Sequence, residues 1–273
     1  MAYAGGAKPQ FLVCVLCSKE VIMKVAVVID KGLYSGGEFQ QELSTVMILN
    51  KYKDRHYDFL FVTTKKENLE ILRTYGVDAD LLRCNLMDRI FDRLYHLRSG
   101  IPTPDSYVSP LDKFLIKKGI DLVCFLSPSP LCLKLRAHNY IFTVMDLCHR
   151  DFNEFPEVNF YNEFEAREYL YTRALPKSVS IIVDSLLSRD NVVFRYCVDE
   201  KRVHIVPFLP SIAVRVGNGS DSTIRMMDVK MQYAIPGDYI YYPAQFWSHK
   251  NHIYILDALK VLMNRGKIGR AHV

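Results

Sequence analysis

The alternation of apolar and polar segments along the chain predicts strands and helices in turn. Short runs of β-branched, aromatic and other apolar residues have the length and composition of buried strands. Between them lie segments whose apolar residues recur every three to four positions, which is typical of helices. Such alternation predicts βαβ units and a mostly parallel sheet. The predicted strands are 24–29, 57–62, 120–126, 140–145, 180–183 and 203–206, and the predicted helices are one that begins near 39 and those at 67–75, 87–97, 111–118, 161–175 and 185–196.

A further strand and helix are predicted near the C-terminus. Residues 239–242 are aromatic and apolar, Pro243 ends this run, and a polar turn then leads into apolar residues at helical spacing. Ser248 is the predicted N-cap of the helix, and Gly266 stands where the helix should stop. Backbone N–H groups at a strand–helix turn bind anions, and Lys250 adds a positive charge. The turn therefore predicts a phosphate site.

The residues of this turn resemble a known family. The run Pro243-Ala-Gln-Phe-Trp-Ser-His-Lys-Asn-His252 is similar to the turn that opens the second domain of group 1 glycosyltransferases. These are retaining, nucleotide-sugar-dependent enzymes with two facing Rossmann-like domains, the GT-B architecture. The resemblance is closest to a subgroup associated with mannosyl transfer, and it implies that Lys250 contacts the donor diphosphate. Ala244 or Gln245 occupies the place of the family's second phosphate-binding arginine. Glutamine is common at that place in the resembled subgroup.

The resemblance covers roughly residues 23–266 and implies a division of the chain. The family's Glu-x7-Glu donor motif cannot be placed, so we expect a transferase that is truncated after the start of its second domain and inactive in this form. The last residues of the chain read like a translated sequencing adapter. The predicted units are a non-native leader at 1–22, an acceptor-side Rossmann-like domain at 23–210, a linker at 211–236, the start of the donor-binding domain at 237–266 and an artefactual tail at 267–273.

A glycine pair follows the first predicted strand. In an open parallel sheet, ligands collect at the carboxyl ends of the strands. In Ser35-Gly-Gly-Glu-Phe-Gln40, the glycines Gly36 and Gly37 allow a ligand to approach free backbone N–H groups. A tight structural turn explains the same residues equally well. The run is neither the Gly-x-Gly-x-x-Gly of dinucleotide-binding dehydrogenases nor a Walker loop. In the resembled family a glycine pair here faces the donor phosphates or the acceptor.

Polar residues follow the strand predicted at 140–145. Asp146 and His149 are the predicted catalytic residues, because His149 can hydrogen-bond a sugar hydroxyl or a phosphate oxygen. Asp146 can hold either His149 or a sugar hydroxyl in place. The alternative is that Asp146 caps a turn and His149 lies on the surface. The Asp-Leu-x-His-Arg run also resembles the same family, but Met145 stands where many relatives have histidine, so the role of that family histidine is not transferred.

Composition narrows the function classes. With 273 residues, 49% of them hydrophobic and 24% charged, the chain suits one large or two medium globular domains. The net charge of +5 fits an enzyme of anionic nucleotides or peripheral contact with an acidic membrane. Basic and aromatic residues are not interleaved on a predicted face, which argues against nucleic acid as a partner. Seven scattered cysteines indicate reduced thiols in a cytoplasmic protein, and the Cys14–Cys17 pair lacks the second pair that zinc needs.

These features and the resemblance predict a function. The intact enzyme is expected to transfer a mannose-like hexose from a nucleotide sugar such as GDP-mannose to a polysaccharide or glycolipid acceptor, with retention. No metal and no resident cofactor are expected, since GT-B enzymes generally need none. A cytoplasmic protein is expected, with peripheral contact at the inner face of the membrane. Two other classes stay open, namely a non-catalytic α/β binding module and a GT-B-like nucleotide-sugar epimerase.

Overall fold

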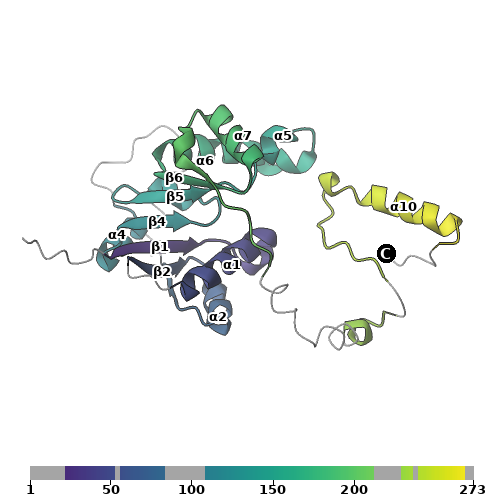
Figure 1. Cartoon of the computed structure of the whole chain (residues 1–273), viewed down its shortest axis with the longest axis horizontal. Coiled ribbons are helices and arrows are strands. Elements are labelled where there is room, and N and C mark those ends of the chain that lie inside the picture. The colour runs from purple at the N-terminus through teal and green to yellow at the C-terminus, as the bar shows by residue number, and fades with distance from the viewer. Residues whose placement is uncertain (1–21, 53–55, 84–107, 212–228, 236–238, 268–273) are drawn as a thin grey trace, which may run out of the picture.

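The computed structural model describes most of the chain (Figure 1). The described residues are 22–52, 56–83, 108–211, 229–235 and 239–267. The predicted leader, apart from its last residue, the helix predicted at 87–97, most of the predicted linker and the predicted tail beyond Lys267 lie outside these residues. The predictions for those segments therefore stay predictions.

Seven parallel strands form one sheet. They are β1 (Met23–Ile29), β2 (Tyr57–Thr63), β3 (Ala79–Leu81), β4 (Leu122–Phe125), β5 (Asn139–Thr143), β6 (Ser180–Val183) and β7 (Val203–Ile205). Their order across the sheet is β3-β2-β1-β4-β5-β6-β7, and each neighbouring pair is parallel. The winding changes direction at β1, which lies between β2 and β4, so the fold is a doubly wound, Rossmann-like α/β fold. The sequence pattern missed β3, whose three half-buried residues form no apolar run.

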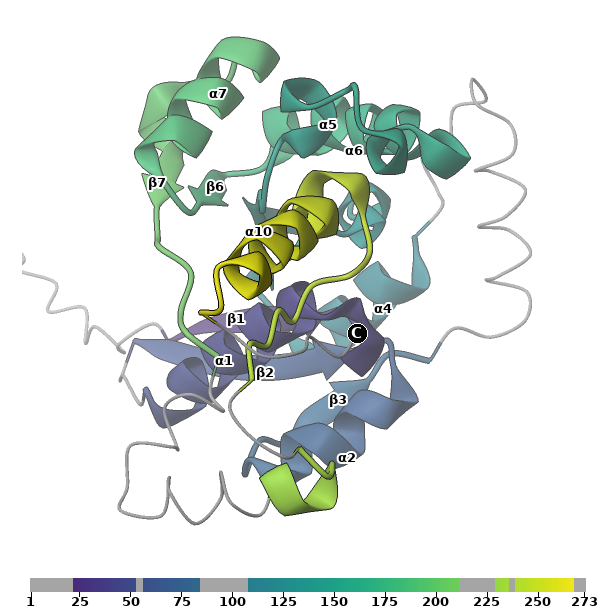
Figure 2. The ribbon, with the colours of Figure 1, turned by 90° about the vertical axis from the view of Figure 1, so that its right-hand side faces the viewer.

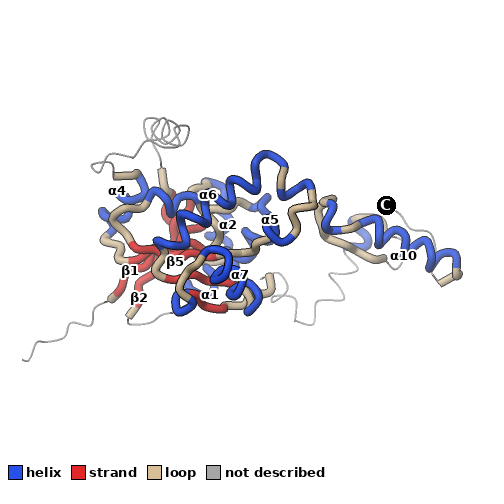
Figure 3. The backbone as a smooth tube through the Cα atoms, turned by 90° about the horizontal axis from the view of Figure 1, so that it is seen from above, coloured by secondary structure: helices blue, strands red, loops and turns tan. Residues whose placement is uncertain are grey.

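Helices cover both faces of the sheet (Figure 3). The α-helices are α1 (Gly37–Lys51), α2 (Lys66–Thr74), α4 (Pro110–Lys118), α5 (Cys148–Asp151), α6 (Glu163–Lys177), α7 (Leu186–Tyr196) and α10 (His252–Asn264). Helices α1 and α2 pack with one core cluster, around Val27, and α4, α6 and α7 pack with the other, around Phe142. This division follows from right-handed crossovers that run in opposite directions from the centre of the sheet. None of the helices in the described ranges combines the length and the apolar character that a membrane span requires.

Short 3₁₀ helices occupy several of the connections. They are η1 (Leu33–Ser35), η2 (Pro130–Lys134), η3 (Pro156–Val158), η4 (Phe160–Asn162), η5 (Glu200–Arg202) and η6 (Ser248–Lys250). In η4, Tyr161 and Asn162 have left-handed backbone angles, with φ of 57° and 60°. Because a right-handed helix cannot continue through such residues, α6 begins at Glu163 rather than at the predicted position 161.

The C-terminal segment corrects two predictions. Residues 239–242 form no strand, since no described strand runs beside them to supply hydrogen bonds. The helix does form as α10, but its N-cap is Asn251, whose side chain accepts from the N–H of Tyr254 at 3.2 Å. Ser248, the predicted N-cap, instead begins η6. The predicted stop is confirmed, since Gly266 follows α10 with φ of 64°.

The segment 239–267 lies beyond the carboxyl ends of the strands (Figures 1 and 2). Its apolar side chains are largely exposed to solvent. The exposed fractions are 69% for Ile240, 74% for Tyr241, 71% for Ile253 and 44% for Leu256. The segment therefore buries little apolar surface of its own, and its place relative to the sheet depends on specific contacts.

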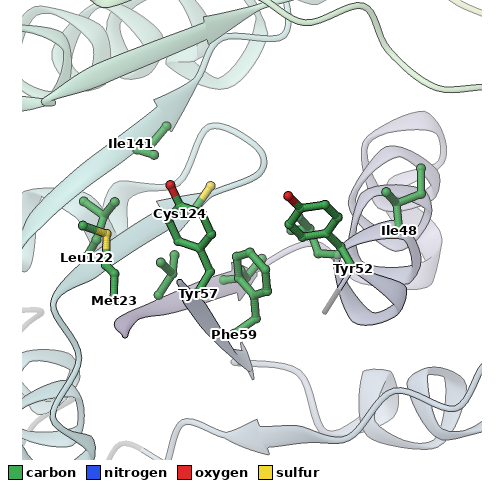
Figure 4. Close-up of a pocket in the computed structure, with 11 residues that line it drawn as sticks. Met23, Ile48, Tyr52, Tyr57, Phe59, Leu122, Cys124 and Ile141 are labelled. Atoms are coloured by element: carbon green, nitrogen blue, oxygen red, sulfur yellow. The ribbon is translucent and has the colours of Figure 1, made fainter. Parts of the chain in front are cut away.

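An apolar pocket of about 420 Å³ lies on the face of the sheet that α1 covers, toward the amino ends of the strands (Figure 4). Met23, Tyr57 and Leu122, the first residues of their strands, line it together with Ile48 and Tyr52 from the end of α1. It therefore belongs to the amino ends of the strands, away from the edge where the polar loops gather.

Candidate functional site

Asp30, directly after β1, joins three loops at the carboxyl edge of the sheet. Its Oδ1 accepts a hydrogen bond from the hydroxyl of Thr64 at 2.7 Å, and its Oδ2 accepts from the hydroxyl of Ser129 at 2.7 Å. Thr64 follows β2 and Ser129 follows β4. The carboxylate therefore fixes the loops on either side of β1, where the winding reverses and a crevice for ligands is expected in such sheets.

Glu42 lies on the face of α1 that packs on the sheet and is fully buried, with 0% of its surface exposed. Its Oε1 accepts from the hydroxyl of Ser127 at 2.5 Å, and its Oε2 accepts from the backbone N–H of Lys31 at 3.1 Å. Burial raises the pKa of Glu42 to about 7, and the two hydrogen bonds lower it less. A carboxyl group that titrates near neutral pH thus connects the loop after β1 to the loop after β4.

The predicted glycine pair lies at the start of α1. Gly36 has φ of 62° and ψ of −122°, and no side chain caps the helix. A Cβ atom added to Gly36 or Gly37 would meet nothing within 4 Å, so the space beside this backbone is open. The uncapped N–H groups of the first turn suit an anion. The nearby ammonium of Lys31 pairs with Glu38 at 2.9 Å.

Gly36→Ala is expected to lower the free energy of unfolding by about 1–3 kcal/mol, because Gly36 has backbone angles that are unfavourable for residues with a Cβ atom. Gly37→Ala is the matched control, since Gly37 is already helical and its Cβ would also meet nothing. Urea denaturation followed by circular dichroism measures both. Equal stabilities for the two variants would show that the turn is not held in this conformation.

Asp146 follows β5 and forms a partly exposed ion cluster. Its Oδ1 accepts from Nη1 of Arg167 at 2.6 Å and from the N–H of Cys148 at 3.0 Å, and 41% of its side chain is exposed. Nε of Arg167 donates to Glu163 at 2.8 Å. Burial raises the pKa of Asp146, but the charge of Arg167 and the hydrogen bonds from Cys148 and Arg167 together lower it more, so the net direction is down. Asp146 therefore presents an ionised carboxylate at the carboxyl edge of the sheet.

His149 is buried, with none of its surface exposed, and it is held by Glu168 rather than by Asp146. Its Nε2 lies 2.7 Å from Oε1 of Glu168, which also accepts from the hydroxyl of Tyr196 at 2.7 Å and from Nε of Arg150 at 2.7 Å. Burial lowers the pKa of His149 more than the hydrogen bond to Glu168 raises it. Within the described residues, Nδ1 of His149 has no hydrogen-bond partner. The predicted location after β5 is correct, whereas neither a surface position nor a contact with Asp146 is found.

Tyr171 connects these parts of the edge. Its hydroxyl reaches the carbonyl oxygen of Asp146 at 3.5 Å, and its ring packs against that of His149 with 5.8 Å between the centroids. Burial raises the pKa of Tyr171, and the charge of Glu38, in the first turn of α1, adds to this effect. Asp146 and His149 thus lie beside one buried tyrosine.

Lys250 and Gln245 lie on the exposed segment before α10. The carbonyl oxygen of Lys250 accepts from the hydroxyl of Tyr242 at 3.0 Å, and the carbonyl oxygen of Gln245 accepts from the N–H of Trp247 at 2.8 Å. In the part of the chain that the structure describes, the ammonium of Lys250 forms no ion pair, and no three His, Cys, Asp or Glu side chains are grouped to hold a metal ion. Lys250 therefore remains available for an anionic ligand.

Comparison with solved structures finds a glycosyltransferase from Rickettsia africae ESF-5, which is 13% identical and aligns with a TM-score of 0.52 over 88% of this chain and 57% of that chain. The likeness is one of fold. Two UDP-N-acetylglucosamine 2-epimerases also align, each at 13% identity, with a TM-score of 0.43 and over 80% of this chain. The one from Rickettsia bellii is covered to 50% of its length. The one from Neisseria meningitidis, whose structure contains bound UDP-GlcNAc, is covered to 54%. No family model and no curated protein matches. The chain spans about half the length of the structures it resembles.

The sequence patterns missed several polar residues at this edge. Glu42 lies on the buried side of α1 with Phe39, Leu43 and Val46. Because a carboxylate at a core position needs a hydrogen-bond partner, its place in this apolar pattern indicates a buried polar contact. Glu168 gives no such signal, because its partners lie 18 to 28 residues away along the chain. Such residues are identified only when the helices are packed together.

Proposed function

We propose that this chain comprises the acceptor-side domain and the beginning of the donor-binding domain of a nucleotide-sugar-dependent hexosyltransferase of the GT-B type. The observation that carries the proposal is the location of three parts at the carboxyl edge of a doubly wound sheet. These parts are the glycine turn at Gly36 and Gly37, the ionised Asp146, and the segment that carries Lys250. The fold likeness to a glycosyltransferase supports the choice of this architecture.

In the proposed complex the donor diphosphate is bound by positive groups from both sides of this edge. The N–H groups at the start of α1, beside Gly36 and Gly37, bind phosphate oxygens on one side. Lys250, with Gln245 as a neutral hydrogen-bonding group, binds them on the other. These groups neutralise the charge that develops as the diphosphate departs, and no resident metal ion or cofactor is required.

In the proposed reaction an acceptor hydroxyl oxygen bonds to the anomeric carbon while the bond from this carbon to the diphosphate oxygen breaks. The hydroxyl proton passes to the departing phosphate, and the anomeric configuration is retained. Asp146 accepts a hydrogen bond from a sugar hydroxyl, and Arg167 keeps its carboxylate charged and oriented. Because His149 is buried, we assign it the role of holding α5 in place beside Asp146. The proposed donor is GDP-mannose or a similar nucleotide sugar, and the acceptor is a polysaccharide or glycolipid at the cytoplasmic face of the membrane.

Lys250→Ala is expected to weaken the binding of a nucleotide sugar by about tenfold or more, because it removes a charge-assisted contact to phosphate. Isothermal titration with GDP-mannose, UDP-GlcNAc and the free nucleotides measures the affinity and selects the donor. Lys260→Ala, an exposed lysine on α10, is the matched control and should bind normally. Normal donor binding by Lys250→Ala would refute this assignment. Conversion of a nucleotide sugar to its epimer without an acceptor would favour the epimerase class instead.

A further inference from the structure

The turn that carries Lys250 contacts the first domain through Glu157. The backbone N–H of His249 donates to Oε1 of Glu157 at 2.9 Å, and Nδ1 of the His249 ring contacts the same oxygen. The rings of Phe155 and His249 pack with 5.9 Å between their centroids. Phe155 and Glu157 lie at η3, in the connection between β5 and β6. Two hydrogen bonds and a ring contact thus converge on His249, the neighbour of Lys250.

Glu157 is suited to anchor this turn. Its side chain is only 11% exposed, so bulk water competes little for its oxygens. Although burial raises the pKa of Glu157, the N–H groups of His249 hold it low, at about 2. Bonds from a backbone N–H and a ring nitrogen to one carboxylate oxygen fix both the position and the orientation of His249. The exposed apolar side chains around the turn supply no comparable constraint.

We propose that η3 is a docking surface for the η6 turn, with Glu157 as its anchor. Because Lys250 is adjacent to His249, this contact fixes the place of Lys250 opposite the carboxyl edge of the sheet. The docking is a property of the fold and does not require the proposed transfer reaction. Only its effect on donor affinity rests on the proposed function.

The test uses the full 273-residue chain, in which Trp247 is the only tryptophan. Its ring lies 5.6 Å from that of His249, so its fluorescence reports on the turn. In Glu157→Ala we expect the fluorescence anisotropy of Trp247 to fall and acrylamide quenching to rise. We also expect the amide hydrogen of His249 to exchange on the order of tenfold faster, since it loses a charge-assisted acceptor. Glu154→Ala, a neighbouring exposed glutamate, should leave all three unchanged.

Unchanged anisotropy and exchange in Glu157→Ala would overturn the docking. Glu157→Gln tests the charge alone, since it keeps an acceptor oxygen and should give a smaller change of the same sign. Circular dichroism checks that each variant is folded. His249→Ala loses the ring contacts but keeps the backbone N–H that donates to Glu157, so it should lower the anisotropy in the same direction as Glu157→Ala. If Glu157→Ala loosens the turn while donor affinity stays the same, the docking holds and the donor site proposed at Lys250 fails.

Discussion

Glu42→Ala should lower the free energy of unfolding by about 3 kcal/mol. The substitution removes the acceptor of the Ser127 hydroxyl and of the Lys31 N–H at a fully buried site. It also leaves a cavity between α1 and the sheet. Urea denaturation followed by far-ultraviolet circular dichroism near pH 4.5, where Glu42 is largely protonated in the folded chain, measures the loss. Lys51→Ala, an exposed residue in the last turn of the same helix, is the matched control for a change in helix composition.

The pH dependence separates the charge of Glu42 from its shape. Its pKa rises from 4.5 to about 7 on folding, so the folded chain binds more protons than the unfolded chain between these values. Stability from this group is therefore complete below pH 4.5 and is lost as the pH rises toward 7. At about 1.4 kcal/mol for each pKa unit, the loss amounts to about 3 kcal/mol. Glu42→Gln keeps the shape and an acceptor but cannot ionise, so its stability should not show this decline. Parallel curves for the two proteins between pH 4.5 and 7 would contradict the assignment.

The sheet was predictable where a strand is buried on both faces. Residues 25–29 of β1 and the whole of β4 form uninterrupted apolar runs, and the partners of these strands follow from the alternation with helices. The aromatic and apolar run at 239–242 also has the residue types of a strand, yet it forms no strand. Composition indicates that a segment can pair, whereas pairing also needs a neighbouring strand with free hydrogen-bonding groups.

The candidate site was predictable in location and less so in its contacts. Rules for parallel sheets correctly place Asp146 and the glycine pair at the carboxyl edge. The partners of His149 were not predictable, because they depend on how α5, α6 and α7 pack together. The same packing turns His149 from a predicted ligand-binding side chain into a buried one. Sequence spacing identifies which loops meet, but the tertiary fold decides which side chains of those loops remain accessible.

Glu168→Ala is expected to cost about 3–4 kcal/mol of unfolding free energy. One carboxylate accepts from His149, Arg150 and Tyr196, and the ring of Tyr196 also lies under the guanidinium of Arg150, 5.1 Å from its centroid. Removing the carboxylate leaves the buried Nε2 of His149 without its partner and breaks the connection between α5, α6 and α7. Thermal and urea denaturation measure the loss. Glu165→Ala, an exposed residue on the same helix, should change stability by no more than about 0.5 kcal/mol.

The cost of Glu168→Ala should depend on pH in the direction opposite to that of Glu42. Hydrogen bonds from Arg150 lower the pKa of Glu168 from 4.5 to about 2, so its stabilising effect is complete above pH 4.5 and is lost as the pH falls toward 2. The stability difference between the native chain and Glu168→Ala should therefore be largest near neutral pH and shrink in acid. A stability difference that stays constant from pH 7 to pH 3 would show that the charge of the carboxylate does not stabilise this cluster. In that case Glu168→Gln, which lacks the charge, would be as stable as the native chain.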